Sequence, residues 1–171
     1  DQVWVNDSAL KQVSSRSAVT TGTFYVDKSA KQLVIGSDPS SKRVDVSTLA
    51  EAMSIRSTNS VIRGIGVRRY ATSVPMMGAI TTYYSGITLE NVMIVDNATT
   101  GLFIGATNAT LKNVTLRNNG LLGMAATQAD NLTIDSVLAE QNNSQRFNCS
   151  PVSGAMKITT TRKISVKKSA F

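Results

Sequence analysis

A segment repeated in the middle of the chain constrains the fold more than any other sequence feature. Residues 87–97 (ITLENVMIVDN) align without gaps on residues 109–119 (ATLKNVTLRNN), and residues 132–142 (LTIDSVLAEQN) form a third copy. A weaker copy occupies residues 60–70, and a fragment of a fifth lies at 165–171. Self-similarity at a period near 22 residues indicates a solenoid, in which each unit stacks on its neighbours.

The unit of this solenoid is built of short strands. Apolar residues recur at spacings of two and three, and β-branched residues are abundant, which predicts strands and not helices. Leucine-rich repeats share the period but need a fixed leucine pattern that is missing here. We therefore expect an all-β fold, a right-handed, single-stranded parallel β-helix of about four to five rungs. The positions that we take as equivalent are separated by 27, 22, 23 and 32 residues, and they are Ile62, Leu89, Leu111, Ile134 and Val166.

Each copy also carries a glycine that opens a second short strand. We predict that these glycines are equivalent to one another, and they are Gly78, Gly101, Gly123 and Gly154. The interval from each glycine to the next repeat is nearly constant, whereas the interval before it varies. Insertions are therefore concentrated at residues 71–77 and 143–153, and variable loops on one side of a rigid scaffold are where function is usually found.

Three asparagines fall at one position of the repeat. They are Asn97, Asn119 and Asn142, and Tyr70 takes the same position in the earlier copy. Equivalent side-chain amides in a stacked coil can donate to and accept from one another along the axis. We predict a structural ladder of these three asparagines, placed at a bend in the left-handed (αL) conformation that asparagine tolerates.

The first part of the chain does not follow the repeat. Residues 1–50 contain three apolar runs separated by turn residues, which predicts a small antiparallel β cap, and residues 51–171 form the β-helix. Residues 49–53 fit either a short helix or the edge of the first rung. Because the pattern stops at Phe171 part-way through a rung, we expect a β-helix truncated at its C-terminal end.

Composition and charge narrow the possible partners and chemistry. The 18 Lys and Arg against 11 Asp and Glu give a net charge of +7, which favours an anionic partner such as an acidic polysaccharide. Nucleic acid is not expected, because the basic residues near the C-terminus have no aromatic platform beside them. Without His and with one Cys, the chain lacks the residues for a Cys/His zinc site, an internal disulfide or a His-dependent triad. No apolar run approaches the roughly 20 residues of a transmembrane helix.

Four segments resemble a known family. Residues 3–6 (VWVN), 22–27 (GTFYVD), 35–39 (IGSDP) and 63–70 (RGIGVRRY) resemble bacterial, actinobacterial-type right-handed parallel β-helix repeat proteins of the pectin-lyase-like superfamily. The resemblance covers nearly the whole chain and implies an exported protein, secreted or at the cell surface, that handles polysaccharide. The superfamily includes polysaccharide lyases, glycoside hydrolases, uronate C5-epimerases and non-catalytic surface proteins, and no family catalytic motif can be transferred to this chain.

Two polar columns offer candidate chemistry. Arg68, Val95, Arg117 and Glu140 occupy one repeat position, and Arg69, Asp96, Asn118 and Gln141 occupy the next, which strand alternation predicts on the opposite face. A lyase would need an Arg or Lys base near a carboxylate-bound calcium or another cation. No cofactor is evident in the sequence, and calcium is compatible with it. A hydrolase would need two carboxylates, for which Glu140 and Asp96 are a weak pair. The alternative is an ordinary solvated exterior.

We predict a groove between the two insertions and assign no catalytic residue and no metal site. The predicted substrate-binding residues are Arg117, Glu140, Arg146 and Lys157. The expected function is that of an exported β-helix protein that acts on or binds an acidic extracellular or cell-surface polysaccharide. The alternative is a non-catalytic surface scaffold or carbohydrate-binding module.

Overall fold

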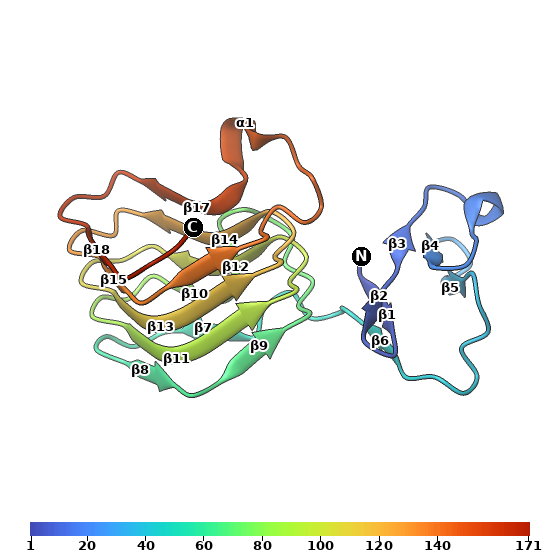
Figure 1. The fold of residues 1–171 in the computed structure, drawn as a ribbon, viewed down its shortest axis with the longest axis horizontal. Helices are drawn as coiled ribbons and strands as arrows, with labels where there is room; N and C mark the ends of the chain where they lie inside the picture. Colours follow the sequence, from blue (N-terminus) through green and yellow to red (C-terminus); the bar gives the residue numbers. More distant parts are fainter. The chain divides into compact units, whose positions relative to one another are not determined.

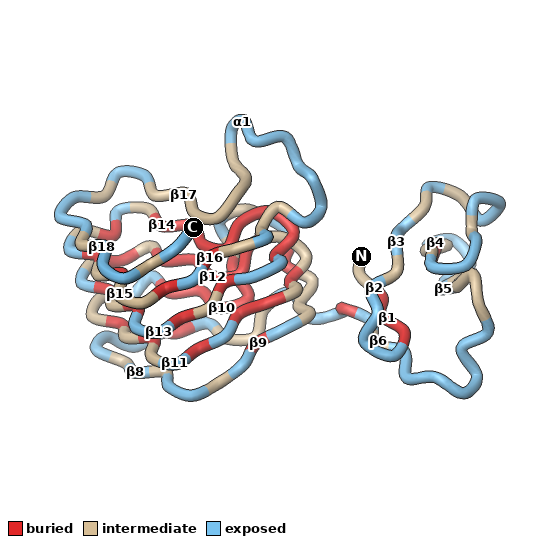
Figure 2. The backbone as a smooth tube through the Cα atoms, viewed as in Figure 1, coloured by how far each residue is buried: buried red, intermediate tan, exposed pale blue.

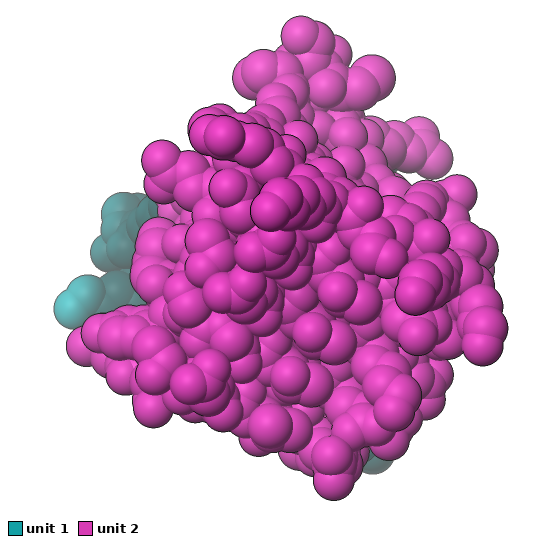
Figure 3. All heavy atoms as spheres, turned by 90° about the vertical axis from the view of Figure 1, so that its left-hand side faces the viewer, with its two compact units in different colours: residues 1–48 teal, residues 49–171 magenta.

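The computed structural model describes residues 1–171 as an all-β protein. The chain divides into two compact units, residues 1–48 and residues 49–171 (Figure 3). Helical structure is limited to the 3₁₀ turn η1 (Arg16–Ala18) and the four-residue α1 (Cys149–Val152). Neither has the length and apolarity needed to cross a membrane.

The first unit contains two three-stranded sheets. In one, β1 (Val3–Val5) pairs antiparallel with β2 (Ser8–Ala9) and β6 (Val44–Val46). In the other, β4 (Thr23–Asp27) pairs parallel with β3 (Lys11–Gln12) and antiparallel with β5 (Gln32–Ile35). Apolar burial in these sheets centres on Trp4 and Phe24. The expected small antiparallel sheets at the N-terminus are confirmed.

The second unit is a parallel β-solenoid of two stacked sheets (Figure 1). The five-stranded sheet contains, in stacking order, β7 (Met53–Ile55), β10 (Gly78–Thr82), β12 (Thr100–Ile104), β14 (Leu122–Thr127) and β17 (Gly154–Thr159). The seven-stranded sheet contains β8 (Val61–Arg63), β9 (Gly66–Arg68), β11 (Thr88–Val95), β13 (Thr110–Arg117), β15 (Thr133–Asp135), β16 (Leu138–Glu140) and β18 (Ser165–Lys167).

The predicted repeat register is confirmed. Leu89 pairs with Ile62 on one side and Leu111 on the other, and the column continues through Ile134 to Val166. Leu89, Leu111 and Ile134 are fully buried in the solenoid core. Figure 2 shows buried segments in red along the stacked strands. Burying each such side chain contributes about 1.5–3 kcal/mol, so this column is a main source of stability.

The start of the solenoid lies at the edge of the first rung. Residues 49–53 contain no helix, and β7 pairs in parallel with β10 through Met53 opposite Ile80. Ala52 also donates its backbone N–H to the Ala79 carbonyl at 2.8 Å. Of the two expectations for this segment, the rung edge is therefore the one that the structure shows.

Each rung turns three corners, and a residue with positive φ stands at each of them. Asparagine and glycine are common at these positions because they tolerate the αL conformation at low cost. The first column is Asn59, Gly86, Asn108, Asn131 and Lys163; the second is Gly64, Asn91, Asn113, Ser136 and Lys168; the third is Arg69, Asp96, Asn118 and Gln141, all with φ between 47° and 77°.

The three predicted ladder asparagines stack beside the third corner. Asn97 Nδ2 donates to Asn119 Oδ1 at 2.8 Å, and Asn119 Nδ2 donates to Asn142 Oδ1 at 3.0 Å. The same oxygens accept backbone N–H groups from the previous rung, and Tyr70 N–H donates to Asn97 Oδ1 at 3.0 Å. Asn97 and Asn119 are fully buried. The predicted αL conformation at these residues is wrong, because the preceding residue makes the bend.

The predicted equivalence of the four glycines is wrong at two of them. Gly78 pairs with Thr100 and Gly154 pairs with Leu122, one residue out of register with Gly101 and Gly123. The physical reason is the ladder. A Cβ at Gly101 would lie 2.9 Å from Asn119 Nδ2, and one at Gly123 would lie 2.8 Å from Asn142 Nδ2. Glycine at these two positions leaves room for the ladder amides, whereas the first level has Ala79 at this register position.

We predict that Asn119→Ala lowers the free energy of unfolding by about 2–5 kcal/mol. The change removes several buried hydrogen bonds and leaves the Asn97 amide without its acceptor, and each unsatisfied buried group costs about 1–3 kcal/mol. Asn148→Ala, which removes one exposed hydrogen bond to Ser150 N–H, should cost no more than about 1 kcal/mol. Denaturant unfolding measures both, and equal losses would contradict a stabilising ladder.

A second prediction concerns the corners. At Asn113, where φ is 52°, glycine should be more stable than alanine by about 1 kcal/mol, because alanine is strained in the αL region. At Thr115, inside β13, the order should reverse, with alanine above glycine. The four variants are compared by thermal and denaturant unfolding. The same order at both positions would show that backbone conformation does not control the corner.

Candidate functional site

The outer face of the five-stranded sheet is covered, unlike that of the seven-stranded sheet. All residues of β10 and β12 are buried, whereas burial along β13 largely alternates. A strand that is buried on both faces loses the alternation of apolar and polar residues. The apolar run Leu102-Phe103-Ile104 is the sequence signal of this two-sided burial.

An aromatic pair lies on this outer face. Phe103 is fully buried, and its ring centroid lies 5.3 Å from that of Tyr83, which is 63% exposed. A Cβ at Gly105 would lie 2.7 Å from the Tyr83 ring. The glycine thus leaves room for the tyrosine to lie along the strands. Tilted aromatic pairs at this separation contribute about 0.5–1.5 kcal/mol beyond area burial.

The first insertion, residues 71–77, is fixed to β12 by polar contacts. Thr72 Oγ1 accepts the Thr99 N–H at 2.8 Å, and the Pro75 carbonyl accepts from Thr100 Oγ1 at 3.2 Å. Thr72 and Thr100 are both buried. Buried hydrogen bonds of this kind hold an irregular loop in one place.

The second insertion, residues 143–153, is fixed to the asparagine corner. Ser144 N–H donates to the Asn119 carbonyl at 3.2 Å, and Gln145 N–H donates to the Gly120 carbonyl at 3.1 Å. Within the loop, Asn143 exchanges hydrogen bonds with the backbone of Phe147 at 2.9 and 2.8 Å. The loop then continues through α1 to β17, where it projects from the stacked strands (Figure 1).

Residues of both insertions line a groove of about 160 Å³, which we call the insertion groove. Pro75 and Met76 come from the first insertion and Val152 from the second. The lining is completed by strand residues, namely Ala125, Ala126, Thr127, Lys157 and Thr159. Lys157 is the charged residue of this lining, and its ammonium contacts the Pro151 carbonyl. A mainly apolar groove with one cation suits a ligand that has an apolar face and an anionic group.

The four residues predicted to bind substrate do not gather at one site. Lys157 lines the insertion groove, and Arg146 lies exposed in the second insertion. Arg117 and Glu140 occupy paired positions of β13 and β16 in the other sheet, with Arg117 Nη1 3.7 Å from Glu140 Oε1. The apolar members of the groove were not anticipated, since proline, methionine and valine in a loop give no chemical signal.

Strand alternation predicts that the two polar columns lie on opposite faces of the strands. The strands end with Val95, Arg117 and Glu140, and the following residues are in the αL conformation. Asp96 Oδ1 accepts from Asn118 Nδ2 at 2.7 Å along this exposed corner. Strand alternation is therefore the wrong guide to where Asp96 lies relative to Glu140.

Most carboxylates of the solenoid have partners within it. Glu90 bonds to Arg63 at 2.7 Å and to Lys112 at 2.9 Å. Asp130 accepts the Arg162 N–H at 2.7 Å, and Asp135 accepts from a serine hydroxyl. No group of three or more His, Cys, Asp or Glu is placed to hold a metal ion.

The Glu90 carboxylate has a lowered pKa, chiefly because Lys112 donates a hydrogen bond to it and also because of Arg63. A lowered folded-state pKa stabilises the protein above the ordinary glutamate value of 4.5, and this stabilisation is lost as pH falls through the folded-state pKa. We predict a shallower acid loss of stability in Glu90→Gln and in Lys112→Met. Unfolding measured from about pH 6 to about pH 3 tests this, and slopes equal to wild type would contradict it.

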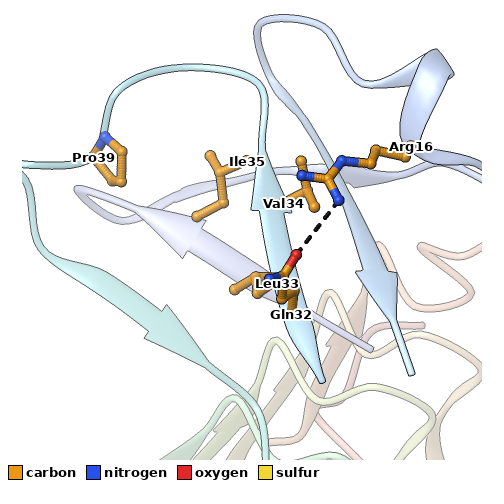
Figure 4. A pocket seen from close by; sticks show the side chains of 6 residues that line it. All are labelled: Arg16, Gln32, Leu33, Val34, Ile35 and Pro39. Carbon is orange, nitrogen blue, oxygen red and sulfur yellow. Dashed lines mark hydrogen bonds between the residues drawn. The ribbon is translucent and has the colours of Figure 1, made fainter. Parts of the chain in front are cut away.

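A second cavity lies in the first unit. It has a volume of about 370 Å³ and is lined by Arg16, Gln32, Leu33, Val34, Ile35 and Pro39 (Figure 4). Arg16 Nη1 donates to Gln32 Oε1 at 3.4 Å across its rim. This depression follows one half-exposed strand, β5, whereas the insertion groove is lined in part by two loops that the repeat does not require. We therefore take the insertion groove as the candidate site.

Fold and site together define an all-β protein with a parallel β-solenoid and small N-terminal antiparallel sheets. The chain matches no protein-family model, no curated protein and no solved structure.

Proposed function

We propose that this protein binds an acidic polysaccharide in the insertion groove, in the extracellular space or at the cell surface. One observation carries the proposal: residues of two insertions that solenoid stacking does not need line one groove together with Lys157. Pyranose rings have apolar faces and uronic acids carry a carboxylate. The groove offers apolar Met76 and Val152, two threonine hydroxyls and one ammonium, which complement both features.

The charge of the solenoid supports an anionic ligand. Residues 49–171 contain 12 of the 18 basic residues but 6 of the 11 acidic ones. The solenoid therefore carries most of the net positive charge of the chain. The electrostatic field of this positive charge speeds the approach of a polyanion, and salt screens it.

The sequence resemblance supports a finer assignment within the proposal. A parallel β-solenoid with a pectin-lyase-like sequence pattern fits the bacterial parallel β-helix proteins of that superfamily, whose members are commonly exported and handle polysaccharides. From this we propose the extracellular or cell-surface location.

We favour binding over catalysis. A lyase needs a base near a carboxylate-bound cation, and a hydrolase needs two carboxylates. The lining of the insertion groove supplies Lys157 but neither Asp nor Glu. Glu90 and Glu140, on the other sheet, are paired with basic side chains. A non-catalytic carbohydrate-binding module is the function that this arrangement supports best.

The test is affinity for polygalacturonate and for neutral dextran, measured by calorimetry. We predict that Lys157→Gln weakens polygalacturonate binding by up to about fivefold, because an exposed ion pair contributes about 0.2–1 kcal/mol, and reduces its salt dependence. Lys28→Gln removes the same charge from an exposed position in the first unit and should leave affinity within about twofold.

Two outcomes would contradict the proposal. Equal affinities of wild type and Lys157→Gln for polygalacturonate would place the site elsewhere. Equal binding of polygalacturonate and dextran would show that the ligand need not be acidic.

A further inference from the structure

A tyrosine on the outer face of the five-stranded sheet is held in place and left open to solvent. Tyr83 is 63% exposed, and its ring centroid lies 5.3 Å from that of the buried Phe103. The turn that follows is fixed by Thr82, whose Oγ1 accepts the Tyr84 N–H at 3.1 Å and lies 3.3 Å from the Tyr84 carbonyl. The exposed part of the Tyr83 ring therefore has a defined position outside the solenoid core.

Strand pairing places Tyr83 in line with two residues of the insertion groove. The parallel register of β10, β12 and β14 continues at Tyr83, Gly105 and Thr127, and Thr127 pairs with Thr159 of β17. Thr127 and Thr159 both line the groove. Because Gly105 has no side chain, the Tyr83 ring lies over β12, where a Cβ would come within 2.7 Å of it.

The surface between the tyrosine and the groove is continuous and apolar. Phe103, which supports the Tyr83 ring, packs in one cluster with Ala125 and Val152, and these two residues line the groove. Phe103 pairs with Ala125, and Ala125 pairs with Lys157. Neighbouring strands lie about 4.8 Å apart, so the ring over β12 and Lys157 on β17 are about 10 Å apart along the solenoid.

We infer that Tyr83 is a stacking platform for one pyranose ring of the acidic polysaccharide, an inference that rests on the proposed function. The C–H groups on a pyranose face carry partial positive charge, which complements the negative face of an aromatic ring. A pyranose unit is about as long as the strand spacing, so about three units reach from Tyr83 to Lys157. One stacks on Tyr83, one lies over β14, and the third places its carboxylate at Lys157.

The experiment compares digalacturonate and trigalacturonate by calorimetry on the full chain. Wild type should bind the trisaccharide about three- to tenfold more tightly, the gain expected of one stacked ring. Tyr83→Ala and Tyr83→Leu should lose this length advantage, and Tyr83→Phe should keep it. Met93→Ala, which truncates a 45% exposed side chain of the other sheet, should also keep it. Thermal unfolding verifies that each variant is folded.

A double-mutant cycle tests where the ring lies. Gly105→Ala places a Cβ against the Tyr83 ring and should reduce the length advantage in wild type. In the Tyr83→Ala background the same change should have no further effect on trisaccharide affinity, because the ring that it displaces is gone. Equal losses in the two backgrounds would contradict a ring placed over Gly105.

The outcomes separate this inference from the proposed function. Lys157→Gln should weaken both saccharides, and the absence of that effect would count against the groove as an acidic-glycan site. If Lys157→Gln weakens both while Tyr83→Ala retains the length advantage, the platform is overturned and the proposed function stands. A loss in Tyr83→Phe as large as that in Tyr83→Ala would assign the contact to the hydroxyl group and overturn stacking.

Discussion

The structure depends on the parallel register between successive rungs. Each strand of the solenoid makes its backbone hydrogen bonds to the strands of the levels above and below it. Residues at one register position therefore form a column, and all members of a column share the same environment. Leu89, Leu111 and Ile134 fill the core at one column. The columns at the corners hold αL residues, and the column beside the third corner holds the amide ladder. A substitution at one level therefore alters the packing of the equivalent residues in the two adjacent rungs.

The same register also positions the candidate site. The ladder residue Asn119 is buried, and its backbone carbonyl accepts a hydrogen bond from the second insertion. The first insertion is held on the adjacent strand through Thr100. Both loops are anchored to ordered residues of the solenoid. Their irregular backbone therefore has a fixed position where it lines the groove. The repeats provide the packed core, and the proposed site combines strand residues of two levels with residues of the inserted loops.

The fold was largely predictable from the sequence because its period is visible. Steps of 22 and 23 residues between Leu89, Leu111 and Ile134 identify the core column and the ladder without further information. The errors have local causes. Asn118 and Asn119 are adjacent asparagines, so the αL residue and the ladder residue are easily exchanged. Gly78 pairs with Thr100 and so lies one register position away from Gly101. This shift is visible only in the strand pairing. In the groove Lys157 was anticipated, but Met76 and Val152 depend on tertiary contacts of loops.

The most direct test of the account is to map a bound oligouronide on the protein. In an NMR titration with a galacturonate oligomer, the account predicts saturable shifts at Met76, Thr127, Lys157 and Thr159, the residues of the insertion groove. Signals of the other sheet around Arg117 should remain unchanged. Shifts confined to Arg117 and Glu140, with the groove residues unaffected, would contradict the assignment of the insertion groove as the polysaccharide site.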